Sequence, residues 1–209
     1  MWSYQKKLQY PIHIHTPDAR MAKLIIDQYG GPHGELGASL RYISQRYSMP
    51  WPELKAILTD IGTEELAHLE MISAIVYQLT RNLTPEQIRE AGFDAYFMDH
   101  TTGIYPADAS GVPFSAQTFA STGDPLADLH EDLAAEQKAR LTYDNILRFA
   151  KDPDVRDPIK FLREREIVHY QRFGEALRIA TDHLDSKNLY ALNPAFDKWK
   201  RRPAGDKKA

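Results

Sequence analysis

Apolar residues recur at the spacing of an α-helix over four long stretches of this chain. The first two stretches, residues 18–47 and 51–79, are separated by Pro50-Trp51-Pro52, which ends one helix and starts the next. Because this turn is short, we expect the two helices to be antiparallel neighbours. The apolar positions that carry the two patterns are Leu24, Ile25, Leu36, Leu40, Ile43, Leu54, Ile57, Leu58, Ile61, Leu69, Ile72 and Ile75.

The second half of the chain predicts another antiparallel pair, with one helix at residues 124–150 and the next ending near residue 183. Asp124-Pro125 is typical of an N-cap followed by proline at the first helical position. Two further Asp-Pro pairs predict successive stop and start signals between the helices, at residues 152–153 and 157–158.

Residues 92–123, between the two helix pairs, are rich in Gly, Pro, Ser and Thr. A short helix, opened by a capping box at Thr84 and Gln87, precedes this stretch. A loop of this length in a compact domain is often a crossover, and here it can return the chain to the opposite end of the bundle. The sequence therefore predicts an all-α fold, a ferritin-like four-helix bundle with one long crossover between its second and third helices.

Three segments are expected along the chain. Residues 1–17 form an N-terminal extension whose prolines favour extended structure, residues 18–184 form the bundle domain, and residues 185–209 form a polar, basic C-terminal tail. Four large apolar residues predict that part of the tail packs on something, such as a neighbouring subunit: Tyr190, Leu192, Phe196 and Trp199.

A cluster of helix-breaking residues lies inside the first predicted helix, around Glu35. Glycine and proline destabilise a helix interior, so the cluster needs a reason. Either two helices join here, or the segment is distorted where its backbone crowds a functional site; we favour the second interpretation because Glu35 lies at its centre. The cluster consists of Gly30, Gly31, Pro32, Gly34 and Gly37.

Composition narrows the class of protein. With 209 residues, 43% of them hydrophobic and 26% charged, the chain is long enough for one domain with a substantial core. A net charge of −3 gives no basic patch for nucleic acid, and no apolar run is long enough to predict a membrane span. The N-terminus has no apolar signal-peptide core, so a cytoplasmic protein is expected. Because cysteine is absent, any bound metal must take oxygen and nitrogen ligands.

The clearest chemical pattern is a motif that occurs twice. Glu65-x-x-His68 returns as Glu166-x-x-His169. Three residues are about one turn of a helix, so each carboxylate lies on the same face as its imidazole.

Each motif also has a matching carboxylate upstream. Glu35 lies 30 residues before Glu65, and Glu136 lies 30 residues before Glu166. A Glu from each of two helices, with Glu-x-x-His from each of the other two, is the ligand set of a dimetal carboxylate bundle. Such ligands suit manganese or iron, and the pattern alone does not decide between the two metals.

Tyrosines repeat with the same symmetry. Tyr42 follows Glu35 by seven residues, and Tyr143 follows Glu136 by seven, which returns each tyrosine to the same helix face. Both are consistent with core aromatics or with hydrogen-bond donors to the ligand carboxylates. The other histidines show no such pattern and are interpreted as structural or surface residues: His13, His15, His33, His100, His130 and His183.

Several strings resemble the non-haem manganese catalases, and most closely the CotJC-type spore-coat members of that family. The resemblance covers about residues 18–185 and is carried by Gly34-Glu-Leu-Gly-Ala38, Asp60-Ile-Gly-Thr-Glu-Glu-Leu-Ala-His68, Gly111-Val-Pro113, Leu133-Ala-Ala-Glu-Gln-Lys-Ala-Arg140 and Asp152-Pro-Asp-Val-Arg-Asp157.

The resemblance implies two manganese ions per subunit. It makes Glu166 an acid/base carboxylate near the substrate and Tyr42 a hydrogen-bond donor to a ligand. It also implies disproportionation of hydrogen peroxide, a homohexamer, and a possible place in a spore coat with other coat proteins. The five manganese ligands that it implies are Glu35, Glu65, His68, Glu136 and His169.

Two other functions stay open. The ligand set also permits a di-iron ferritin-like oxidase or peroxidase, and a structural coat protein could use the metal site for assembly rather than turnover.

Overall fold

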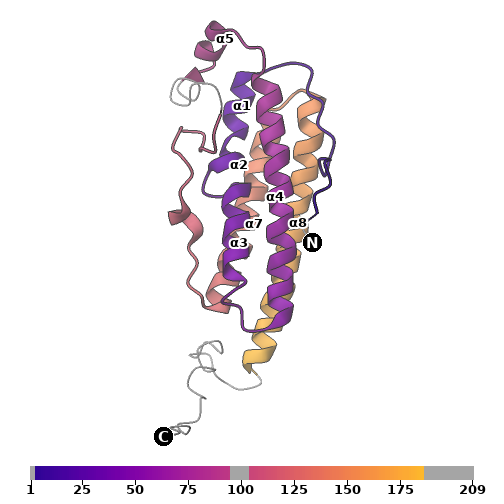
Figure 1. The fold of residues 1–209 in the computed structure, drawn as a ribbon, viewed down its shortest axis with the longest axis vertical. Coiled ribbons are helices and arrows are strands. Elements are labelled where there is room, and N and C mark those ends of the chain that lie inside the picture. Colours follow the sequence, from indigo (N-terminus) through magenta and orange to yellow (C-terminus); the bar gives the residue numbers. More distant parts are fainter. Residues whose placement is uncertain (1–2, 95–103, 186–209) are drawn as a thin grey trace, which may run out of the picture.

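The computed structural model describes residues 3–94 and 104–185, and these fold into a bundle with four parallel columns (Figure 1). The first column consists of three successive helices, and the other three columns are single long helices. The chain descends the first column, ascends the second, crosses over, ascends the third and descends the fourth. The columns are α1 (Ala19–Ile25), α2 (Asp27–Gly30) and α3 (Glu35–Gln45) together, then α4 (Pro52–Thr80), α7 (Pro125–Phe149) and α8 (Pro153–Asp185).

The prediction of one continuous helix at residues 18–47 is wrong, because the chain leaves the helix between Gly30 and Glu35. Close packing explains the glycines at this break. A Cβ added to Gly30 would lie 2.3 Å from the backbone nitrogen of Ala107, and one on Gly34 would lie 2.7 Å from the carbonyl oxygen of Asp27. The segment is therefore a junction of helices, and the backbone that crowds Gly30 belongs to the crossover. This junction makes Glu35, a candidate ligand, the first residue of α3.

The crossover runs the length of the bundle, as predicted. It begins with α5 (Pro85–Glu90), whose capping box pairs Thr84 with Gln87 as expected. The chain then descends outside α2 and α3 through a short 3₁₀ helix, η1 (Ala116–Phe119), to the start of α7 (Figure 1). Nη2 of Arg41 donates a 3.0 Å hydrogen bond to the carbonyl oxygen of Thr118, which ties the crossover to α3.

The second helix pair starts at its predicted signals, with one correction. Oδ1 of Asp124 accepts hydrogen bonds from the backbone at the start of α7, as expected of an N-cap. Asp157-Pro158 is not a second start, because Pro158 lies inside α8, which begins at Pro153. This proline is close to the N-terminus of the helix, so it removes only the backbone hydrogen bond to the carbonyl of Asp154 and the helix continues.

Two apolar cores lie at different heights of the bundle, and the polar motifs lie between them. In α4 the upper core begins at Met71 and the lower core ends at Ile61; in α8 the upper core ends at Leu162 and the lower core begins at Phe173. Gly62 brings α3 and α4 close together, because a Cβ there would lie 3.2 Å from Cβ of Tyr42.

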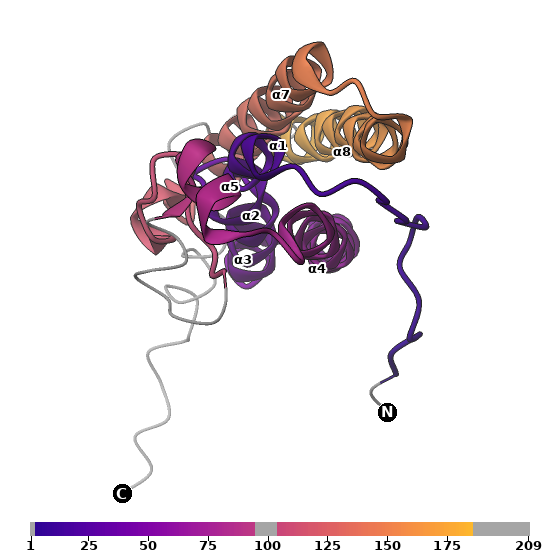
Figure 2. The same ribbon diagram turned by 90° about the horizontal axis from the view of Figure 1, so that it is seen from above.

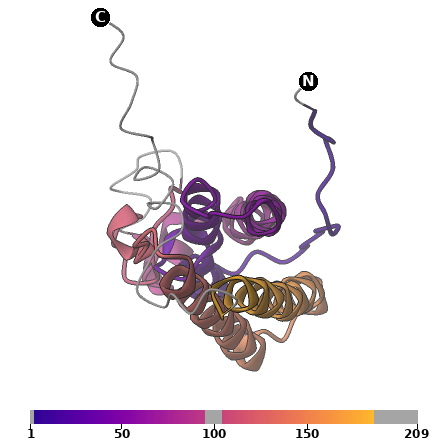
Figure 3. The ribbon, with the colours of Figure 1, turned by 90° about the horizontal axis from the view of Figure 1, so that it is seen from below.

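The N-terminal segment lies across α4 and α8, on the side of the bundle away from the crossover (Figures 2 and 3). Ile12 and Ile14 are buried in the upper core, whereas His13 and His15 are exposed. The backbone N–H of Ile14 donates to Oε1 of Gln78 in α4 at 2.7 Å. Toward α8, the ring of Tyr10 stacks on Phe161 with centroids 5.1 Å apart.

Among residues 3–94 and 104–185, no helix combines the length and the hydropathy that a membrane crossing requires. The tail residues Tyr190, Leu192, Phe196 and Trp199 lie outside the described residues.

Candidate metal centre

The two Glu-x-x-His motifs face each other in the middle of the bundle. Glu65 and His68 come from α4, Glu166 and His169 come from α8, and each residue is at most 2% exposed. One ligand atom from each of the four lies within 4.8 Å of the others. The two imidazole rings are 5.5 Å apart between centroids and nearly parallel. The cluster has the residue types and the burial of a dimetal carboxylate site.

Glu65 lies between the two imidazoles. Its Oε2 is 2.7 Å from Nδ1 of His68, and its Oε1 is 2.7 Å from Nδ1 of His169. Burial alone would raise the pKa of Glu65, but the facing imidazoles hold it well below its usual range. Burial would likewise lower the pKa of each imidazole, but the Glu65 carboxylate raises both. Without metal the cluster therefore holds protons on its histidines, and a divalent cation that displaces them restores the same balance of charge.

Glu35 and Glu136 flank this centre from the other two columns. Oε2 of Glu35 is 3.7 Å from Nδ1 of His68, and Oε2 of Glu136 is 3.6 Å from Nδ1 of His169. Each imidazole Nδ1 therefore faces two carboxylates. Burial, together with the negative charge of Glu65, raises the pKa of Glu35 to about 8.

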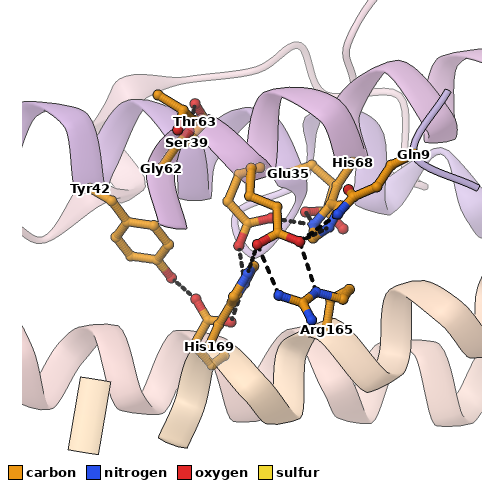
Figure 4. Close-up of polar contacts among 12 residues, drawn as sticks. Gln9, Glu35, Ser39, Tyr42, Gly62, Thr63, His68, Arg165 and His169 are labelled. Atoms are coloured by element: carbon orange, nitrogen blue, oxygen red, sulfur yellow. Dashed lines mark hydrogen bonds and ion pairs between the residues drawn. The ribbon is translucent and has the colours of Figure 1, made fainter. Parts of the chain in front are cut away.

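The two tyrosines pair across the bundle. The Tyr42 hydroxyl in α3 donates to Oε1 of Glu136 in α7, and the Tyr143 hydroxyl in α7 donates to Oε1 of Glu35 in α3. Burial raises the pKa of both tyrosines, and the facing carboxylates raise it further, so both stay protonated donors. Each tyrosine thus orients the carboxylate of the opposite half, and Figure 4 shows Tyr42 in this arrangement.

Glu166 has different surroundings. Its Oε1 is buried and has no hydrogen-bond partner among the described residues. Burial raises the pKa of Glu166 well above its usual range, and the negative charges of Glu136 and Glu35 add to this shift. Glu166 is thus, with Glu35, one of two carboxyl groups in the cluster whose raised pKa favours the protonated form.

A narrow pocket of about 10 Å³ reaches the cluster between α3 and α7. That volume is of the order needed for one water molecule, so the pocket suits only a very small substrate. Glu35, Glu136 and Glu166 line its inner part, and His33 and Arg41 also line it. His33 is therefore close to the candidate site, which its sequence pattern did not predict.

The remaining histidines lie away from the centre. Nδ1 of His130 is 2.8 Å from the Leu126 carbonyl oxygen on its own helix, and His183 stacks on Trp51 with ring centroids 4.6 Å apart. Nδ1 of His15 is 2.7 Å from Oδ2 of Asp154 on the surface. His100 lies outside the described residues.

Three residues near the outer nitrogens of the imidazoles had no predicted role: Arg165, Gln9 and Glu64, over which Glu65 was chosen as the ligand because it keeps the three-residue step to His68. Glu64 contacts Nε2 of His169 at 3.1 Å and Nε2 of His68 at 3.6 Å. Arg165 and Gln9 both donate hydrogen bonds to the Glu64 carboxylate (Figure 4). The spacing of Glu64 and His68, four residues apart on one helix face, was an available signal. No spacing could have predicted Gln9, because it comes from the N-terminal segment.

Three comparisons with known proteins agree. A family profile described as manganese containing catalase matches residues 1–192. Protein CotJC of Bacillus subtilis is 51% identical over 190 residues, which cover 91% of this chain and all of CotJC. A probable manganese catalase of Clostridium acetobutylicum is 32% identical over 192 residues, 90% of this chain and 85% of that protein. The crystal structure of KatB, a manganese catalase from Anabaena, matches with a TM-score of 0.79 at 30% identity, over 87% of this chain and 81% of KatB. This likeness confirms the ferritin-like bundle.

Proposed function

We propose that this chain, which belongs to the manganese-containing catalase family, binds two manganese ions and disproportionates hydrogen peroxide to oxygen and water. The observation that carries the proposal is the position of Glu65, whose two oxygens each lie 2.7 Å from the Nδ1 of one imidazole. A carboxylate in this position is suited to be shared between two metal ions, with one histidine on each.

We assign five residues to hold the metals. Each imidazole Nδ1 and the carboxylates that face it offer the hard nitrogen and oxygen ligands that manganese accepts. When bound, the two ions supply the reversible exchange of two electrons, one from each ion, without an organic cofactor. The assigned ligands are Glu35, Glu65, His68, Glu136 and His169, as the family resemblance implies.

The reaction needs proton transfer as well as electrons. One peroxide loses two electrons and two protons and becomes oxygen; the other takes up two electrons and two protons, its O–O bond breaks, and two water molecules form. We assign Glu166 as the group that carries protons between these two steps. Its buried Oε1 has no hydrogen-bond partner among the described residues, and burial raises the pKa of its carboxyl, which favours the protonated form.

Two tyrosines hold the flanking carboxylates in place. A neutral hydroxyl that donates to one oxygen of Glu35 or Glu136 leaves the other oxygen of that carboxylate for metal. The small pocket beside Glu35, Glu136 and Glu166 supports a substrate as small as peroxide.

One observation favours a second candidate function, a di-iron oxidase or peroxidase. Glu166 offers a ligand atom within 4.8 Å of those of Glu65, His68 and His169. In a symmetric di-iron site all four residues would be ligands.

Elemental analysis of the purified protein, together with oxygen evolution from peroxide, tests these alternatives. Manganese with oxygen release supports the catalase. Iron without oxygen release supports the second candidate, and bound metal without peroxide chemistry supports a structural role in a coat.

We also propose a homo-oligomer, a hexamer by the resemblance, and a cytoplasmic protein that is deposited in the spore coat with other coat proteins. The support is the family resemblance and the similarity to CotJC. Sedimentation of the full chain and fractionation of spores test this.

A further inference from the structure

We infer that Glu64 is a positioning residue for both metal-site histidines, and that Gln9 in the N-terminal segment helps to hold it there. The inference rests on the proposed function only in requiring that the centre binds metal. It adds Glu64 and Gln9 to the residues that metal binding requires, beside the five proposed ligands and Glu166.

The first observation is that one carboxylate serves two imidazoles. Oε2 of Glu64 is 3.1 Å from Nε2 of His169, and Oε1 is 3.6 Å from Nε2 of His68. An imidazole that donates its Nε2–H to a carboxylate has its other nitrogen, Nδ1, free to bind a metal. In both histidines Nδ1 is the atom that faces Glu65. The hydrogen bond from Glu64 therefore favours, for His169, the ring orientation that turns Nδ1 to the centre, and the second Glu64 oxygen lies within ion-pair distance of Nε2 of His68.

The second observation is that Glu64 is itself held from two sides. Nε and Nη2 of Arg165 donate to its two oxygens at 2.8 and 3.0 Å, a bidentate pair. Nε2 of Gln9 donates to Oε1 at 2.6 Å. An isolated surface ion pair contributes little, but the Glu64 side chain is only 20% exposed and lies against two fully buried rings.

The N-terminal segment carries Gln9 past α4 and α8, with contacts to both helices. Tyr4 donates to Glu70 of α4 on one side of Gln9, and Tyr10 stacks on Phe161 of α8 on the other. Beyond these contacts Ile12 and Ile14 are buried in the upper core. Gln9 is thus fixed by a segment with its own anchors on both helices, so that retention of the metals depends on the N-terminal segment as well as on the bundle.

The test measures Mn²⁺ affinity by competition with a chelator, in the full-length protein and without reference to turnover. Changing a hydrogen-bond partner of a metal ligand typically costs about 10–100-fold in metal affinity. We expect a loss in that range for Glu64→Gln, because the amide lacks the charge and can present a donor to an N–H. For Gln9→Ala we expect a loss of about three- to tenfold, because Arg165 still holds Glu64.

Tyr4→Phe is the matched control. It removes a hydrogen bond of the same segment to the same helix, at Glu70, and leaves Glu64 untouched. Because Tyr10, Ile12 and Ile14 still anchor the segment to the bundle, we expect wild-type Mn²⁺ affinity for this variant. Gln9 is exposed, so Gln9→Ala remains informative even if Glu64→Gln fails to fold.

Two further measurements separate positioning from a general loss of structure. The visible absorption of Co²⁺ bound in place of manganese depends on the ligand field at the metal, and we expect this absorption to shift in Glu64→Gln. The melting temperature of metal-free Gln9→Ala should stay at the wild-type value. If both variants bind Mn²⁺ as tightly as the wild type, or if Gln9→Ala matches Tyr4→Phe, the inference is wrong. A wild type that binds Mn²⁺ without releasing oxygen overturns the proposed function alone.

Discussion

The α3–α4 half and the α7–α8 half of the centre carry the same residues at the same spacing, yet their two motif carboxylates differ. Both oxygens of Glu65 face an imidazole at 2.7 Å, and the pKa of Glu65 is lowered. Oε1 of Glu166 has no hydrogen-bond partner among the described residues, and its pKa is raised by burial. The comparison teaches that two copies of the same ligand motif can have different electrostatic surroundings.

The residue before each motif carboxylate is one of the positions at which the halves differ in sequence. Glu64 precedes Glu65, whereas Arg165 precedes Glu166, and these two residues pair with each other. Glu64 lies 3.1 Å from the outer nitrogen of His169 and 3.6 Å from that of His68, whereas Arg165 contacts Glu64 itself. The two positions therefore have different contacts although the motifs beside them are the same.

The largest effect is expected from exchanging each motif carboxylate for its amide. We expect Glu166→Gln to keep both metals and to lose about 10²–10⁴-fold in peroxide turnover, because the amide has the same shape and cannot carry the proton. Glu65→Gln is the matched variant and is expected to lose metal. Oxygen evolution with elemental analysis of both proteins measures the difference. Metal loss in Glu166→Gln would instead mean that the halves are equivalent and the site is of the symmetric di-iron type.

The two histidines offer the next test, since the comparison treats them as equivalent ligands. We expect His68→Ala and His169→Ala each to lower Mn²⁺ affinity beyond the 10–100-fold typical of changing a ligand's partner, because each removes a ligand. His130→Ala is the control, because this exposed side chain contacts only its own helix. Full metal loading of His169→Ala, measured by elemental analysis, would refute the assignment.

The stability of the metal-free protein should depend on pH, and this dependence tests the charges described for the two halves of the centre. Glu35 has a folded pKa of about 8 against 4.5 for an unperturbed group, so the folded state holds a proton that the unfolded chain releases between these values. This contribution to stability is complete below about pH 4.5 and is lost as the pH rises through about 8. The raised pKa values of His68 and His169 act in the same direction.

We therefore expect the melting temperature of chelator-treated protein to fall from about pH 5 to about pH 8, a change on the order of a few kcal/mol in the free energy of unfolding. Glu35→Gln should flatten the curve, because it removes one of the titrating groups. Manganese-loaded protein should lack the decline, because metal binding favours the deprotonated ligands. A flat profile for the metal-free wild type would contradict the charge balance described for the cluster.

The smallest effect is expected where the two halves are most alike. Tyr42→Phe and Tyr143→Phe each leave one buried carboxylate oxygen without its donor, which typically costs about 1–3 kcal/mol. Urea unfolding of the metal-free proteins measures this, with Tyr77→Phe as the control at a side chain that is 67% exposed. Clearly unequal losses for the two variants would show that the tyrosine pairing is not symmetric in energy.

The sequence predicted the bundle well because the apolar periodicity, the caps and the crossover length all depend on local chemistry. The break between α2 and α3 depends instead on Ala107, which packs on Gly30 from 77 residues away, and no local pattern reports such a contact. For the same reason, no local pattern could predict that Gln9 contacts Glu64. The choice of metal ligands stays a prediction: Glu35, Glu65, His68, Glu136 and His169. Glu65 and Glu166 occupy the same place in their motifs, and only their different surroundings distinguish them.

The crossed tyrosine bonds also bear on the order of events during synthesis. Tyr42 and Glu35 leave the ribosome with the first helix pair, but their partners, Glu136 and Tyr143, follow about a hundred residues later. Until α7 and α8 dock, Glu35 lacks its donor, Tyr42 lacks its acceptor and the cluster lacks His169, and contacts this distant in sequence form slowly. Binding of the proposed metals therefore requires that both helix pairs have been made and joined, and a chain truncated before His169 should lack the complete centre.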